Sequence, residues 1–176
     1  GITRDKALMF NKQEGDWYYE QLDLGLNYRM TEMQAALGCS QMGRLDTFVS
    51  ERNKHASFYH NVLSDYDLIL PVQDPSVYSS YHLFIIKLKS RCPTKRRIIF
   101  DFMRENDIGV NVHYIPIHLH PFYKSINFKK GDFPVAEEYY DCTISIPIYP
   151  NIGQASLNKV AKTLGDAIDF ANLSQW

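Results

Sequence analysis

A change of pattern at Thr31 constrains the fold of this chain more than any other feature. Residues 1–30 are polar and aromatic and follow neither the period of a helix nor that of a strand. Thr31 and Gln34 have the form of a capping box, in which each side chain accepts a hydrogen bond from the backbone N–H of the other residue. Apolar residues then recur at roughly helical spacing, and two glycines among them are expected to weaken or bend the helix. The pattern predicts an irregular arm over 1–30 and a long connecting helix over 31–63.

Residues 64–176 alternate between segments with the period of a strand and segments with the period of a helix. Thr94 is expected to cap the first helix, and Pro116 and Pro121 are expected to prevent regular structure in the loop that holds them. This order predicts an α+β fold, with a small, mainly antiparallel sheet covered by helices, and makes 64–176 a small C-terminal domain. The expected strands are 68–70, 81–88, 109–114 and 143–146, and the expected helices are 94–107, 136–140 and 157–168.

The charge and composition of the chain exclude several classes of protein. The 19 Lys and Arg residues nearly balance the 20 Asp and Glu residues, so we expect no binding to nucleic acid or to an anionic membrane. The longest apolar runs are far shorter than the roughly 18 to 20 residues that span a bilayer, so no transmembrane segment is predicted. Three widely spaced cysteines favour a reducing compartment, the cytoplasm. The chain also begins without Met or a signal segment, as if within a longer protein.

Three histidines, His113, His118 and His120, fall within eight residues and form the densest polar group in the sequence. Their spacing allows two interpretations. Three imidazoles on a strand and the loop after it could ligate a catalytic zinc ion, although no acidic residue lies among them. The interpretation that we favour is that they form hydrogen bonds to a sugar, a phosphate or the backbone, and we predict no metal.

Two further polar groups are weaker signals. Asn27 and Arg29 precede the predicted helix, where arginine and asparagine donors could hold a phosphate, although such a stretch is more often a turn. Glu137 and Glu138 are neighbours on a predicted helix, so their side chains should point apart, and we expect a solvated face. Sequence motifs of serine hydrolases, of phosphate-binding loops and of zinc proteases are absent.

Six sequence blocks carry a resemblance to a known family: GITRD at 1–5, LGLNYRMTEMQAALG at 24–38, Arg52-Asn53 followed by Tyr59, VHYIP at 112–116, FPVAE at 133–137 and SIPIYP at 145–150. Together they resemble the DegT/DnrJ/EryC1/StrS family of nucleotide-sugar aminotransferases. The blocks keep the order and spacing of the family over essentially the whole chain. The resemblance is greatest to the branch that aminates UDP-4-keto-6-deoxy-N-acetyl hexosamines on the route to pseudaminic acid.

The resemblance implies the C-terminal part of a dimeric fold-type I enzyme. Such an enzyme uses pyridoxal 5′-phosphate and usually L-glutamate to convert a UDP-linked 4-keto sugar into the 4-amino sugar, in the cytoplasm, as part of polysaccharide or pseudaminic acid biosynthesis. Residues 1–30 then belong to the end of the large domain, and 64–176 form the small C-terminal domain.

The resemblance also implies roles for particular residues. Asn27 is expected to reach the active site of the neighbouring subunit, near the cofactor phosphate and the substrate, with Arg29 close to the cofactor. The residues expected to contact the nucleotide sugar are Asn27, His113, Tyr114, Ile115, Pro116 and His118.

The lysine that binds the cofactor covalently in this family is expected to precede Gly1. Lys6 and Lys12 come after the position where that lysine should fall, so we expect no catalytic residue and no covalently bound cofactor in this chain. The isolated chain is accordingly expected to be inactive. The alternative is a cofactor-free module that binds a nucleotide sugar or mediates dimerisation.

Overall fold

The structure is a computed structural model that describes residues 1–11, 17–26 and 28–173. The chain divides into two compact units, Gly1–Gly43 and Arg44–Trp176, which are described separately. No helix in the described ranges is long and apolar enough to cross a membrane.

The first unit holds an irregular arm with one short strand pair. Strand β1, Ile2–Thr3, pairs antiparallel with β2, Glu20–Gln21. The carboxylate of Glu20 is buried and accepts hydrogen bonds from the backbone N–H groups of Phe10, at 2.7 Å, and Asn11, at 2.8 Å. One side chain therefore replaces the backbone pairing that a longer hairpin would supply.

The predicted long helix is present as two helices, so the prediction of one continuous helix was wrong. Helix α1 spans Glu32–Met42 and α2 spans Leu45–Leu63, with Gly43 and Arg44 between them. Glycine costs about 1 kcal/mol relative to alanine within a helix. None of the α1 side chains is buried in the described part of the chain, so no packed face of α1 offsets this cost.

The capping box at the start of α1 is confirmed. The Thr31 side chain accepts from the Gln34 N–H at 3.3 Å, and the Gln34 side chain accepts from the Thr31 N–H at 2.9 Å. Because no α1 side chain is buried, these two hydrogen bonds contribute much of the stability of the first turn of α1.

We expect Thr31→Ala to destabilise the first turn of α1 by about 1 kcal/mol, since it removes the capping hydroxyl. Hydrogen exchange should then be about fivefold faster at the first-turn amides and unchanged in α2. Thr31→Ser keeps a hydroxyl and serves as the control. Equal exchange in Thr31→Ala and Thr31→Ser would contradict the capping role.

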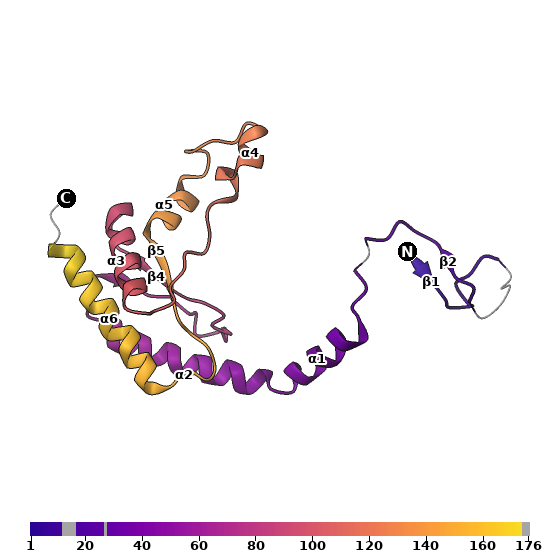
Figure 1. Cartoon of the computed structure of the whole chain (residues 1–176), viewed down its shortest axis with the longest axis horizontal. Helices are drawn as coiled ribbons and strands as arrows, with labels where there is room; N and C mark the ends of the chain where they lie inside the picture. Colours follow the sequence, from indigo (N-terminus) through magenta and orange to yellow (C-terminus); the bar gives the residue numbers. More distant parts are fainter. Residues whose placement is uncertain (12–16, 27, 174–176) are drawn as a thin grey trace. The chain divides into compact units, whose positions relative to one another are not determined.

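The second unit is a three-stranded antiparallel sheet packed with helices, which confirms the predicted α+β fold (Figure 1). The strand order is β3, β4, β5. Helix α6 packs on both α2 and α3, and α5 packs on α3 and β4. The elements are β3, Leu68–Ile69; β4, Phe84–Leu88; α3, Pro93–Glu105; α5, Pro134–Cys142; β5, Thr143–Ile146; and α6, Gln154–Leu173.

The core lies between the sheet and these helices. Along β4 the burial alternates, with Phe84, Ile86 and Leu88 buried and the residues between them half-buried. The ring of Phe84 lies 5.1 Å from that of Tyr59 on α2. All four β5 residues are buried, so this strand is covered on both faces.

Two segments differ from the sequence prediction. Residues 109–114 form one isolated bridge, between Asn111 and Ser145, and no strand. The loop predicted to be irregular contains the 3₁₀ helix η1, Ile117–Leu119, and the short helix α4, Pro121–Ser125. Proline lacks the N–H that a first helical position leaves unpaired, so Pro121 starts a helix and does not prevent one.

The start of α3 also differs from the prediction, because the capping residue is Cys92 and not Thr94. The helix begins at Pro93, and the Sγ of Cys92, in place of Thr94, accepts from the backbone N–H of Lys95 at 3.4 Å. The presence and the apolar face of the helix were predicted correctly, with Ile99 and Met103 buried.

Candidate substrate groove and cofactor site

An apolar groove of about 610 Å³ lies beside the start of α5 in the second unit. Two segments of the chain line it: one contributes His113, Tyr114 and Pro116, and the other contributes residues 132–136 and Tyr139. The side chain of Tyr114 is 71% exposed, so its ring is available to a ligand. The groove thus combines aromatic and proline surfaces with a small number of polar groups, as ligand sites commonly do.

The isolated bridge to β5 fixes the position of His113. Asn111 and Ser145 exchange backbone hydrogen bonds of 3.2 and 2.8 Å. Two residues further along, Nδ1 of His113 lies 2.7 Å from Oγ of Ser145. A ring held through one nitrogen has the other nitrogen free to face a ligand.

A buried hydrogen-bonded pair lies next to the groove-lining residues of α5. Nε2 of His118 lies 2.8 Å from Oε1 of Glu137, and both side chains are almost fully buried. The expectation that Glu137 lies on a solvated face was wrong, although its neighbour Glu138 is exposed and pairs with Lys87 at 3.0 Å. The hydrogen bond from His118, followed by the N–H of Gly131, holds the pKa of Glu137 below its ordinary value of 4.5.

The predicted substrate residues fall into two groups. His113, Tyr114 and Pro116 line the groove, and Ile115 between them is exposed. His118 is bound to Glu137 and is not one of the lining residues. In the parts of the chain that the structure describes, no three His, Cys, Asp or Glu side chains come close enough together to hold a metal ion.

Arg29 lines a separate pocket of about 650 Å³ within the first unit. This pocket is also lined by Gly1, Asp23, Gly25 and Tyr28. Asn27 lies outside the described residues. The exposed guanidinium of Arg29 is a chemical fit for the phosphate of pyridoxal phosphate, because its planar fork of donors matches phosphate oxygens.

A second cavity of the second unit, of about 560 Å³, contains residues that the sequence interpretation missed. Lys159 of α6 and His82 lie in it together with Asn111 and with His113, which lines both cavities. These residues come from segments far apart in the sequence and carry no local motif, so only the fold identifies the group.

Residues 4–165 match the DegT/DnrJ/EryC1/StrS aminotransferase family, and the chain belongs to this family. Its members are pyridoxal-phosphate-dependent aminotransferases. The family, its fold class and its cofactor, which the sequence blocks predicted, are thereby confirmed.

Particular relatives and a solved structure agree with this assignment. The chain is 33% identical to the spore coat polysaccharide biosynthesis protein SpsC of Bacillus subtilis, over 90% of the chain and 42% of SpsC. It is 28% identical to the UDP-4-amino-4,6-dideoxy-N-acetyl-beta-L-altrosamine transaminase of Helicobacter pylori, over 82% of the chain and 39% of that protein. The structure of Spr1654 from Streptococcus pneumoniae, in its PMP form, has the same fold, with a TM-score of 0.88 at 23% identity. That match covers 97% of the chain and 43% of Spr1654, so the chain spans less than half the length of these relatives.

Proposed function

We propose that this chain is the C-terminal part of an aminotransferase that converts a UDP-linked 4-keto-6-deoxy sugar into the 4-amino sugar, with L-glutamate as the amino donor. The observation that carries the proposal is the family match over residues 4–165. The similarity to the altrosamine transaminase supports the choice of sugar. The relatives suggest a route to pseudaminic acid or another cell-surface polysaccharide, in a cytoplasmic homodimer.

In this proposal the groove beside α5 binds the nucleotide sugar. Tyr114 and Phe133 offer aromatic faces to a planar or apolar part of the ligand, and Pro116 adds a rigid apolar surface. His113, held by Ser145, offers a polar contact to the sugar or the diphosphate. Ile115 lies between two lining residues and adds apolar surface at the rim.

Arg29 and Asn27 are proposed to hold the cofactor phosphate, with Asn27 also close to the substrate. When bound, pyridoxal phosphate supplies the electron sink of the amino transfer. On the same resemblance we propose three parts of the chain: an arm of the large domain at 1–30, a connecting helical segment at 31–63 and the small C-terminal domain at 64–176. The role of this chain is then to bind and orient the cofactor and the substrate, while the covalent attachment lies elsewhere in the enzyme.

The test of this function is an assay of the full-length enzyme that carries this chain. The enzyme, loaded with pyridoxal phosphate, is incubated with a UDP-4-keto-6-deoxy-N-acetyl hexosamine and L-glutamate, and the products are identified by mass spectrometry. We expect the 4-amino sugar and 2-oxoglutarate in equal amounts. Formation of neither product, by an enzyme that has bound the cofactor, would disprove the proposed reaction.

We expect Arg29→Ala to weaken the binding of pyridoxal phosphate to the full-length enzyme by about 10- to 100-fold, because a charge-assisted phosphate contact is lost. The Kd is measured by titrating the apoenzyme with cofactor and following its absorbance. Arg104→Ala removes an exposed arginine of α3 and is the matched control. Equal affinities of the two variants would contradict the assignment of Arg29.

The second candidate function is a nucleotide-sugar binding module without cofactor. It is favoured by one observation: the groove is lined by residues of the second unit alone. Calorimetry of the isolated chain with UDP-N-acetylglucosamine distinguishes the two candidates. Binding that Tyr114→Ala abolishes would support the module, and the absence of heat would exclude it.

A further inference from the structure

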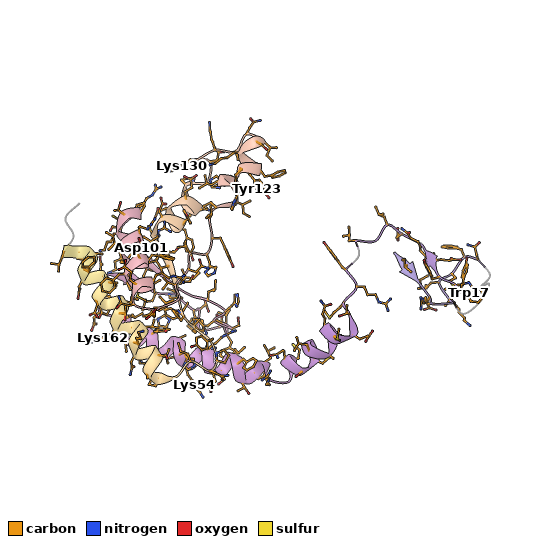
Figure 2. The ribbon with its side chains drawn as sticks, in the orientation of Figure 1. Trp17, Lys54, Asp101, Tyr123, Lys130 and Lys162 are labelled. Carbon is orange, nitrogen blue, oxygen red and sulfur yellow. The ribbon has the colours of Figure 1, made fainter. Side chains whose placement is uncertain are left out.

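Residues 117–133, which follow Pro116, form a small aromatic lobe, and the last two of them also line the groove. It contains η1 and α4, which pack on one another. In Figure 1 α4 lies away from α2 and α6, and Figure 2 shows Tyr123 and Lys130 on this projecting part. The lobe therefore has little contact with the core that stabilises the rest of the unit.

A chain of ring contacts runs through the lobe. Centroid separations are 6.3 Å from Tyr123 to Phe128, 6.1 Å from Phe128 to Phe133, and 4.8 Å from Phe133 to His118. Phe128 and Phe133 are still 37% and 48% exposed. Because these rings are only partly buried, they stabilise the lobe less than fully buried core residues would. A further contact is therefore needed to hold the lobe in place.

That attachment is one oxygen atom of Glu137. Its Oε1 accepts a hydrogen bond from His118 Nε2 at 2.8 Å and another from the backbone N–H of Gly131 at 2.6 Å. His118 lies at the start of the lobe and Gly131 near its end, so a single carboxylate joins both ends to α5. Gly131 has a φ of +98°, a conformation that favours glycine and that directs its N–H to Glu137.

We propose that Glu137 is a positioning residue that holds the aromatic lobe against α5 and so fixes the spacing of the two segments that line the substrate groove. Pro116 precedes the lobe and Phe133 ends it, and both line the groove. Phe133 also contacts the imidazole that Glu137 binds. The proposal rests on the proposed function for its substrate, whereas the attachment of the lobe is independent of any substrate.

The test uses the full-length enzyme with three substitutions. Glu137→Ala removes the acceptor, and Glu137→Gln keeps an oxygen that can accept from both His118 and Gly131. Glu138→Ala is the matched control, since it removes the adjacent carboxylate, which is exposed and bound to Lys87. Hydrogen exchange of residues 117–133 and the steady-state constants are measured for each variant.

For Glu137→Ala we expect faster exchange in the lobe and a KM for the nucleotide sugar raised by about tenfold, as for the loss of one buried hydrogen-bonding partner. The KM for L-glutamate and kcat should change less than about twofold, because in this proposal Glu137 fixes the groove for the nucleotide sugar and does not hold the cofactor. Glu137→Gln should keep a KM within about threefold of the wild type, and Glu138→Ala should match the wild type.

Two outcomes would overturn the positioning role. One is unchanged lobe exchange in a folded Glu137→Ala enzyme. The other is a loss of kcat equal to the change in KM, which indicates general damage. A wild-type enzyme without amino transfer would instead disprove the proposed function, and the exchange measurement would still decide whether Glu137 holds the lobe.

Discussion

Phe84→Ala should destabilise the second unit by about 3–5 kcal/mol, the largest effect that we expect from one substitution in this chain. Phe84 is fully buried at the start of β4, and its ring lies 5.1 Å from Tyr59 and 5.3 Å from His60. Removing the ring leaves a cavity between the sheet and α2 that rigid strands and helices cannot close. Because 1 kcal/mol shifts the midpoint of thermal unfolding of a domain of this size by about 3–4 °C, the midpoint should fall by about 10–20 °C.

The matched control for this prediction is Phe122→Ala, which removes the same ring from a side chain that is 68% exposed. We expect a change within about 0.5 kcal/mol in urea unfolding followed by far-ultraviolet circular dichroism. A similar destabilisation by both substitutions would show that the core does not lie where the structure has it.

Tyr59→Phe should cost about 1–3 kcal/mol, because it removes one buried hydroxyl and leaves the partly buried carbonyl of Pro147 without this donor. The hydroxyl of Tyr59 donates to the backbone oxygen of Pro147 at 2.8 Å, and the side chain is fully buried. Tyr78→Phe, at a tyrosine that is 69% exposed, should change the stability by less than about 0.5 kcal/mol. If the two variants unfold at the same urea concentration, the bond to Pro147 contributes nothing.

The same tyrosine should give the second unit a dependence on alkaline pH. Burial, and to a smaller extent the proximity of Tyr149, raises the pKa of Tyr59 above its ordinary value of 10. The unfolded chain releases the phenol proton first, so this contribution to stability is complete below pH 10 and is lost as the pH rises towards the pKa of the folded state. The free energy of unfolding should therefore fall less steeply above pH 10 in Tyr59→Phe than in the wild type.

Local patterns predicted most of the elements of this fold. The capping box at Thr31, the alternating strand that became β4 and the stripe of α6 depend on neighbouring residues, and all were found. The prediction failed where contacts between residues far apart in the sequence determine the secondary structure. The helix breaks at Gly43 because α1 has no buried face, and 109–114 is no strand because only one residue pair meets β5.

The candidate site was predicted in part, and for a similar reason. His113, Tyr114 and Pro116 are consecutive or nearly so, and a family block identifies them together. The burial of Glu137 was missed because its hydrogen-bond partners, His118 and Gly131, lie 19 and 6 residues away in the sequence. Adjacent glutamates on a helix give no sign of which one is buried.

The single bridge between Asn111 and Ser145 has a consequence for how this chain behaves in concentrated solution. An uncovered sheet edge is a template on which other molecules add strands and aggregate. Here one edge is the two-residue strand β3, which ends shortly before Pro71, and the other is β5, where the bridge occupies the backbone of Ser145. Both edges are therefore too short or too interrupted to propagate strand addition, and the sheet is protected against polymerisation along its hydrogen-bonding direction.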